Sequence, residues 1–139
     1  MNLNFCHSAP AGSTSSPVTK DDGTVVAHGW AGNHDGKLNH AMQEVHNVGP
    51  LPVGVYRIGR WQDTDHLGPM AAPLLQIEGE TFGRSGFWIH GAAKDPKKYG
   101  QESKGCLVIE HEEREAVRDL TNRDSFRTPE DHDTLTVTA

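Results

Sequence analysis

The sequence has no excess of positive charge and no long apolar run. Its 139 residues carry a formal net charge of −6 at pH 7, whereas proteins that bind nucleic acid present a basic face to the phosphate backbone. We therefore expect no nucleic-acid partner. No segment approaches the roughly 20 apolar residues that a membrane-spanning helix needs, so we expect no membrane span. Residues 1–6 show neither the basic nor the apolar region of a secretory signal.

Cysteine is also scarce. A disulfide between the two cysteines, Cys6 and Cys106, would leave no free thiol, and we expect both to be reduced, with Cys6 contributing to packing. Histidine is frequent, with nine residues, but the chain lacks the His-Glu-x-x-His and Cys-x-x-Cys spacings of metal sites. We therefore expect no metal and no cofactor. The length predicts one domain over residues 1–139, with one core and a monomer as the default state.

The apolar pattern that is present is typical of short strands. Alternating or β-branched runs separated by Gly, Pro and polar residues predict strands at 2–7, 24–30, 53–58, 74–77, 87–89, 107–109 and 133–139. Segments 8–23, 31–52 and 59–73 are expected to be loops, with Asp21-Asp22-Gly23 forming a hairpin turn. The fold class is thus mainly β and mostly antiparallel.

One helix is expected, at about residues 111–122. Ala116, Val117 and Leu120 share one face of it, and Glu112, Glu113 and Glu115 lie in its first turns, where the helix dipole favours acidic side chains.

The candidate catalytic residues lie within residues 87–109. The apolar run 87–89 leads to His90 and Gly91, and a loop rich in Gly, Lys and Pro then returns to Ser103-Lys104-Gly105-Cys106, where an apolar run resumes. If these two strands are neighbours, the imidazole and the thiol meet. A nucleophilic thiol needs a base or a cation beside it, because its free pKa is roughly 8.5. The pattern favours a cysteine nucleophile; the alternative is an inert core cysteine near a hydrogen-bonded histidine.

The His-Gly pair, the loop and Ser-x-Gly-Cys before an apolar strand resemble the signature of L,D-transpeptidases, which remodel peptidoglycan through a cysteine. The similarity extends over residues 32–39, 48–58, 66–69 and 82–91 to the small L,D-transpeptidase-like toxins of bacterial type VI secretion systems. It covers the chain from about residue 2 onward. The resemblance implies a single catalytic domain with an L,D-transpeptidase-like β-sandwich or barrel and one helix toward its C-terminal side.

The resemblance also implies a role for each residue of the motif. Cys106 would be the nucleophile and His90 its general base and later acid, with the imidazole oriented by the Gly91 carbonyl. The amides of Gly105 and Cys106 would form the oxyanion hole. Ser103 would hydrogen-bond near the histidine or tie the loop, or be an ordinary turn serine.

In such enzymes the cysteine attacks the carbonyl between meso-diaminopimelate and D-alanine of a tetrapeptide stem. The thioester then passes to water (L,D-carboxypeptidase) or to a D-amino acid (L,D-exchange). We expect a protein made in the cytoplasm without a signal peptide and injected into the periplasm of a target bacterium. It would have a cognate immunity protein and a secretion-apparatus partner. The alternatives are a non-catalytic peptidoglycan-binding module and a cysteine endopeptidase of peptide crosslinks.

Three further residues are candidates for substrate binding. Lys104 stands where many housekeeping L,D-transpeptidases have a histidine, and with Lys94, Lys97 and Lys98 it forms either a solvated loop, the favoured interpretation, or an anion-attracting rim. Arg84 would grip a substrate carboxylate bidentately or pair with an acidic residue. Trp88 is a core residue in the favoured interpretation and a substrate platform in the other. Segment 8–20 is expected to be a loop insertion without catalytic consequence.

Overall fold

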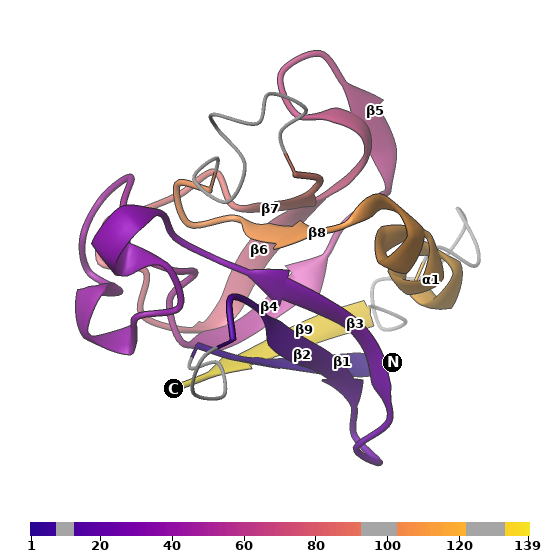
Figure 1. The fold of residues 1–139 in the computed structure, drawn as a ribbon, viewed down its shortest axis with the longest axis horizontal. Coiled ribbons are helices and arrows are strands. Elements are labelled where there is room, and N and C mark those ends of the chain that lie inside the picture. The colour runs from indigo at the N-terminus through magenta and orange to yellow at the C-terminus, as the bar shows by residue number, and fades with distance from the viewer. Residues whose placement is uncertain (8–12, 93–102, 122–132) are drawn as a thin grey trace.

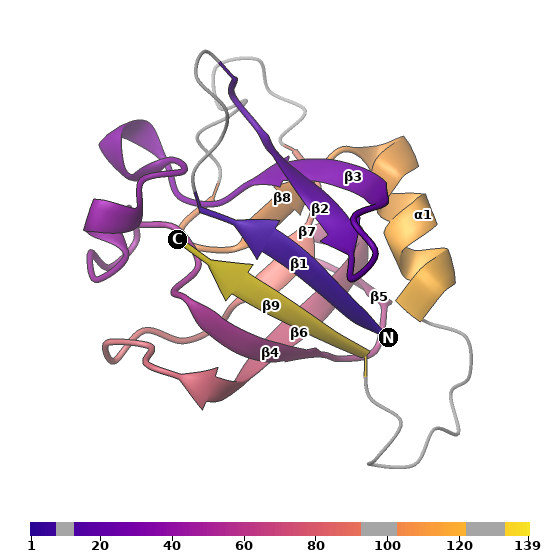
Figure 2. The ribbon, with the colours of Figure 1, turned by 90° about the horizontal axis from the view of Figure 1, so that it is seen from below.

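The chain folds into a β-barrel with one helix against its outside (Figures 1 and 2). The computed structural model describes residues 1–7, 13–92, 103–121 and 133–139. Within them the elements are β1 (Asn2–Cys6), β2 (Ser16–Lys20), β3 (Val25–Trp30), the 3₁₀ turns η1 (His34–Gly36) and η2 (His40–Met42), β4 (Gly54–Ile58), β5 (Gln62–Thr64), β6 (Gly68–Gly79), β7 (Trp88–His90), β8 (Leu107–Ile109), α1 (His111–Thr121) and β9 (Asp133–Thr138). The mainly β prediction is confirmed.

The strands follow one another around the barrel in the order β4-β9-β1-β2-β3-β8-β7-β6, and pairing of β6 with β4 closes the ring. In the part of the chain that is described, β5 pairs only with β6 and lies outside the ring. Most pairs are antiparallel, as predicted. Two are parallel. One joins β1 to β9 and so places the first and last strands of the chain side by side (Figure 2), and the other joins β7 to β8.

The barrel interior forms the core. Alternate side chains of each strand point inward, as in β1, where Leu3 and Phe5 are buried between partly exposed neighbours. The same alternation in β9 buries Leu135 and Val137. Truncating such a side chain to alanine costs about 2–5 kcal/mol. The interior is therefore filled by side chains, and any site must lie on the outer face or at a rim.

Two of the predicted loops, 8–23 and 59–73, contain strands. Residues 16–20, 62–64 and 68–73 were expected to be loops and instead form β2, β5 and the first half of β6. Their Pro, Ser and Gly content hides the pattern, and pairing with neighbouring strands overrides the weak local preference. The turn at Asp21-Asp22-Gly23 is confirmed: the Gly23 amide donates to the Lys20 carbonyl at 3.0 Å, and Gly23 has a φ of +89°. Residues 8–12 of the predicted insertion lie outside the described residues.

The predicted helix is present, but its buried face differs from the prediction. Arg114, Val117 and Thr121 are buried, whereas Ala116 is exposed and Leu120 only partly buried. Arg114 can face inward because its Nε donates to the Met70 carbonyl at 3.0 Å and its Nη1 to the Ile109 carbonyl at 2.7 Å.

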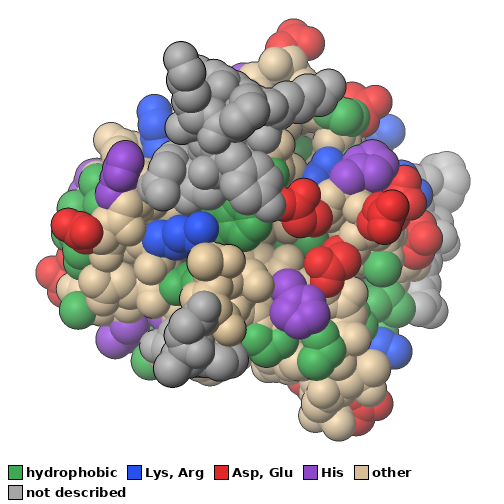
Figure 3. Space-filling view, viewed as in Figure 1, with side chains coloured by type: hydrophobic (Ala, Val, Ile, Leu, Met, Phe, Trp, Pro, Cys, Tyr) green, Lys and Arg blue, Asp and Glu red, His purple; other side chains and the backbone are tan. Residues whose placement is uncertain are grey.

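The other face of α1 is exposed and acidic. Figure 3 shows acidic and histidine side chains gathered over α1 and the neighbouring strand. The ion pair between His28 of β3 and Glu113, 2.9 Å long, belongs to this surface. None of the described helices is long and apolar enough to cross a membrane.

Candidate active site

Strands β7 and β8 lie side by side (Figure 1), and the register of their parallel pairing brings the predicted histidine and cysteine to one face of the barrel. Ile89 pairs with Leu107 and His90 with Val108, so Cys106, one residue before β8, aligns with Trp88. Strands lie about 4.8 Å apart and rise about 3.3 Å per residue, which places the Cα atoms of His90 and Cys106 about 8 Å apart on the same face. Because the alternate residues Ile89 and Leu107 point into the core, this face is the outer one.

His90 is held as a neutral base. Its side chain is buried, and Nδ1 lies 2.9 Å from the Gly91 carbonyl. A carbonyl only accepts, so Nδ1 carries the proton and Nε2 presents a lone pair. Burial lowers the pKa of His90, and the nearby charge of Arg114 acts in the same direction. The Gly91 carbonyl thus takes the orienting position that was predicted for it.

Cys106 is a free, partly buried thiol. Burial raises the pKa of Cys106, while a hydrogen bond from the Trp88 backbone and the charge of Arg84 oppose the rise. The Sγ atom lies 3.8 Å from the Gly86 carbonyl. With the thiol pKa raised and the imidazole pKa lowered, the resting pair is thiol and neutral imidazole, not an ion pair.

Ser103 ties the turn that leads to the cysteine. Its buried Oγ accepts from the Gly32 amide at 2.9 Å and the Gly105 amide at 3.2 Å, and donates to the Cys106 carbonyl at 2.6 Å. The tying role is therefore the one that the geometry supports, and Ser103 is not hydrogen-bonded to His90. The Gly105 amide, one of the two predicted oxyanion-hole donors, is thus engaged by Ser103.

Arg84 is bonded to the protein's own backbone. The residue is only 6% exposed, and its guanidinium donates to four backbone carbonyls: Nη1 to Gln43 at 2.6 Å and Pro50 at 2.8 Å, and Nη2 to Gly49 at 3.0 Å and Lys104 at 3.1 Å. Within the described part of the chain no acidic side chain forms an ion pair with it. Both Nη atoms are thus engaged by backbone carbonyls, and Arg84 also lines the cleft beside Lys104. Binding of a substrate carboxylate by Arg84 stays a prediction.

Trp88 is not in the core, contrary to the favoured prediction. It is half-buried on the outer face, and its ring meets that of His66 edge-on with centroids 5.9 Å apart. Trp88 lines a cleft of about 360 Å³ whose walls are mostly apolar and include Leu75 and Gly86. Because Gly86 also contacts the Cys106 thiol, this cleft adjoins the nucleophile, and a platform role for Trp88 remains a proposal.

Lys104 is exposed and lines a second cleft, of about 210 Å³, with His46, Asn47 and Ser85 among its neighbours. The other three lysines of the predicted cluster, Lys94, Lys97 and Lys98, lie outside the described residues.

Two residues near the site were missed in the sequence. Asn33 donates through Nδ2 to the Ser103 carbonyl at 2.6 Å and to the Asn47 carbonyl at 2.7 Å. Arg114 packs so closely against Gly91 that a Cβ there would lie 2.3 Å from Nη1. The available signals were weak: Asn33 stands in a Gly- and Asn-rich segment, and Arg114 lies one turn before the apolar Val117.

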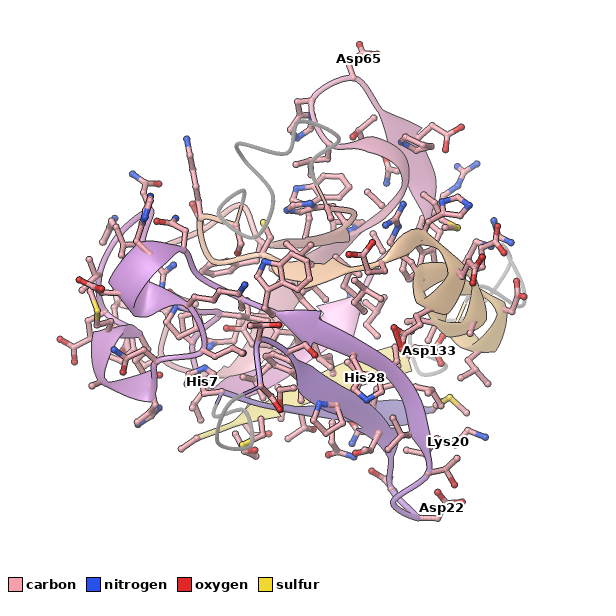
Figure 4. The ribbon with its side chains drawn as sticks, in the orientation of Figure 1. His7, Lys20, Asp22, His28, Asp65 and Asp133 are labelled. Carbon is pink, nitrogen blue, oxygen red and sulfur yellow. The ribbon has the colours of Figure 1, made fainter. Side chains whose placement is uncertain are left out.

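The other histidines that the structure describes contact at most single ligating side chains, as His28 does with Glu113. His7 and His28 lie on the β1–β3 side of the barrel, far from the β5–β6 turn that carries Asp65 (Figure 4). His7 is fully buried, with Nδ1 3.0 Å from Nδ1 of His40. No group of three His, Cys, Asp or Glu side chains that could hold a metal ion occurs among the residues that the structure describes.

The sequence matches the Tlde1 domain over residues 25–130, which is most of the chain. The chain belongs to the Tlde1 domain family. This is a family of L,D-transpeptidase-like type VI secretion effectors, and the matched region holds the whole His90–Cys106 segment. No curated protein sequence matches the chain.

Solved structures share the fold of this Tlde1 domain. The helical cell shape determining protein Pgp2 of Campylobacter jejuni, in its K307A form, is 15% identical with a TM-score of 0.58, over 98% of this chain and 46% of that one. LD transpeptidase LdtMt1 in complex with imipenem is 13% identical with a TM-score of 0.51, over 98% of this chain and 58% of that one. An L,D-transpeptidase from Mycobacterium smegmatis is 13% identical with a TM-score of 0.51, over 99% and 58%. The chain thus spans about half the length of these proteins, and the likeness shows the L,D-transpeptidase-like fold.

Proposed function

We propose that this Tlde1 domain is a cysteine-dependent enzyme that modifies the stem peptides of peptidoglycan. The observation that carries the proposal is the parallel β7–β8 register, which sets Cys106 and His90 on one outer face. The bond from His90 Nδ1 to the Gly91 carbonyl turns Nε2 into the acceptor for the thiol proton. Membership of the effector family supports the choice of peptidoglycan as substrate.

The reaction begins at the carbonyl between meso-diaminopimelate and D-alanine. As Sγ of Cys106 attacks the carbonyl carbon, Nε2 of His90 takes the thiol proton, and the Cys106 amide donates to the oxyanion of the tetrahedral intermediate. When the intermediate collapses, the C–N bond breaks, and the His90 imidazolium gives its proton to the departing amine of D-alanine. The stem remains bound as a thioester.

The second half-reaction repeats these steps with a different nucleophile. Water, or the amine of a free D-amino acid, loses a proton to His90 Nε2 and attacks the thioester carbonyl. The intermediate then expels the Cys106 sulfur, which recovers its proton from the imidazolium. Water gives a tripeptide stem, and a D-amino acid gives an exchanged tetrapeptide. Either product removes donor stems that a growing wall needs, which makes the activity antibacterial.

The proposed function implies a cellular location and two protein partners. The protein acts as a single catalytic domain in the periplasm of an injected target cell, and it needs a secretion-apparatus component for delivery and an immunity protein in the producing cell. The cleft beside Trp88 and the cleft lined by Lys104 are the candidate positions for the stem peptide.

The test is mass spectrometry of purified muropeptides after incubation with the wild type and with Cys106→Ala, each with and without added D-methionine. We expect tripeptides, or tetrapeptides that carry D-methionine, with the wild type alone. Folding of both proteins is checked by circular dichroism.

Other outcomes would contradict the proposal in distinct ways. Unchanged tetrapeptides with folded wild type, together with peptidoglycan pull-down that survives in Cys106→Ala, would indicate a binding module. Cleavage of crosslinked dimers into monomers with intact tetrapeptides would indicate an endopeptidase.

A further inference from the structure

The guanidinium of Arg84 lies directly beneath the turn that presents the nucleophile. Its Nη2 donates to the Lys104 carbonyl at 3.1 Å. It also contacts Gly105 so closely that a Cβ at that position would lie 2.4 Å from Nη2. Gly105 has a φ of +124°, a conformation that side chains strongly disfavour. The backbone of both residues before Cys106 therefore rests on this one side chain.

The same guanidinium binds the segment that surrounds the turn. The carbonyls of Gln43, Gly49 and Pro50 accept its other hydrogen bonds. This segment, residues 31–53, also reaches the turn through Asn33, which donates to the Ser103 carbonyl. Arg84 thus fixes two pieces of chain relative to each other, and the nucleophile stands at the end of one of them.

The positive charge of Arg84 is buried without an acidic partner. Its contacts among the described residues are backbone carbonyls and the ring of Phe87, 5.5 Å from the guanidinium carbon. A buried cation is expensive unless negative charge approaches it. Cys106 is one of two ionisable groups that raise the pKa of Arg84, the other being Tyr56, although burial is the larger cause and lowers that pKa. Reciprocally, Arg84 acts to lower the pKa of the Cys106 thiol.

We propose that Arg84 is a positioning residue for the nucleophile. Its hydrogen bonds set the turn that presents Cys106, and its buried charge favours the sulfur anion as that anion forms. The positive charge that assists the thiol therefore comes from Arg84, since His90 is neutral at rest. The inference rests on the proposed function only in taking Cys106 as the reacting group; the effect on the thiol exists without any substrate.

The experiment measures the rate at which iodoacetamide alkylates Cys106 as a function of pH. Cys6→Ser is present throughout, so that one thiol reacts. Arg84→Met should raise the midpoint pH of alkylation; a shift of about one unit corresponds to roughly tenfold slower labelling below the midpoint. Arg84→Lys, which keeps a charge, should recover part of the shift. Arg118→Met is the control for the loss of a positive charge, because the hydrogen bonds of that arginine are to Asp119 within α1 and not to residues 103–106.

An unchanged midpoint in folded Arg84→Met, or an equal shift in Arg118→Met, would overturn the proposal. If Arg84→Met does not fold, the proposal is tested by an NMR titration of the wild-type protein. The side-chain ¹⁵N resonances of Arg84 should then titrate with the alkylation midpoint and lose that titration in Cys106→Ala; resonances that do not respond would overturn it. Neither measurement uses peptidoglycan, so failure of the proposed function and failure of this inference are distinguishable.

Discussion

At the scale of single residues, the site differs from cysteine enzymes that hold a preformed thiolate and imidazolium. Burial acts in opposite directions on the two groups: it raises the pKa of Cys106 and lowers that of His90. Both effects favour the neutral pair. In the proposed mechanism the proton therefore moves to Nε2 during the attack, in the manner of a serine hydrolase.

This arrangement predicts the pH dependence of D-alanine release. A neutral imidazole is the active form, so kcat/KM should rise as His90 loses its proton, with an apparent pKa below the usual value of roughly 6.5, and should not fall as pH rises from 7 to 8. His90→Gln should lose about 100-fold or more in kcat. The profile is measured as D-alanine released from tetrapeptide stems between pH 4.5 and 8.5. A decline in kcat/KM across pH 6–8 would indicate an imidazolium as the active form and contradict the neutral pair.

The residues of the motif were predictable from the sequence, but the roles of several were not. His90, Gly91 and Cys106 stand out because a histidine and a cysteine end two apolar runs. Arg84 stands between glycine and serine, which suggests an exposed loop, and an arginine in an exposed loop is a candidate ligand for a substrate carboxylate. Its guanidinium bonds carbonyls contributed 34 to 41 positions earlier in the sequence, which no local pattern reveals.

At the scale of elements, the turn 103–106 is a small hydrogen-bonded structure that joins segment 31–53 to β8. Ser103 contributes three of its bonds, to Gly32, Gly105 and Cys106. Its hydroxyl is fully buried and saturated, so removing it leaves two amides without an acceptor.

Ser103→Ala should therefore lower the free energy of unfolding by about 1–3 kcal/mol, the usual cost of unsatisfied buried polar groups. It should also reduce turnover, because the turn that presents Cys106 loosens. The measurement is urea denaturation with D-alanine release on the same preparations. Asn39→Ala is the matched control: its side chain also bonds backbone groups, at Ala41 and Asp35, but on the exposed side of η2. An equal effect of the two substitutions on turnover would contradict a special role of the turn.

The elements were predicted unevenly, and for physical reasons. The strands at β1, β3, β4, β7, β8 and β9 have apolar alternation that local pattern detects. In β6 the buried run Met70-Ala71-Ala72 is flanked by prolines and a glycine, so its strand conformation is dictated by pairing with β7 and β5. The sequence does not determine whether β7 and β8 are neighbours, although the site depends on their parallel pairing. The register between two strands joined by a long loop is set by the tertiary structure.

At the scale of the whole molecule, the barrel and segment 31–53 are joined at the rim by a buried histidine. His7 follows β1; one ring nitrogen bonds the Leu51 carbonyl and the other faces Nδ1 of His40. The Leu51 carbonyl only accepts, so Nε2 of His7 donates to it and Nδ1 of His7 is the acceptor from His40. Protonation of His7 would add an N–H on the side that faces His40 Nδ1 at 3.0 Å, so His40 would have to change tautomer to accept from it.

Acid should therefore destabilise the fold through this contact. Burial lowers the pKa of His7, and the nearby charges of His40 and Arg84 act in the same direction. A base whose folded pKa lies below its unfolded value of roughly 6.5 contributes stability that is present above pH 6.5 and is lost as pH falls toward the folded pKa. We expect the free energy of unfolding, from urea denaturation at pH 7.5, 6.5 and 5.5, to fall more steeply in the wild type than in His7→Gln. Because His90 titrates in both proteins, its contribution cancels in the comparison. Parallel pH dependences would show that His7 carries no part of the acid sensitivity.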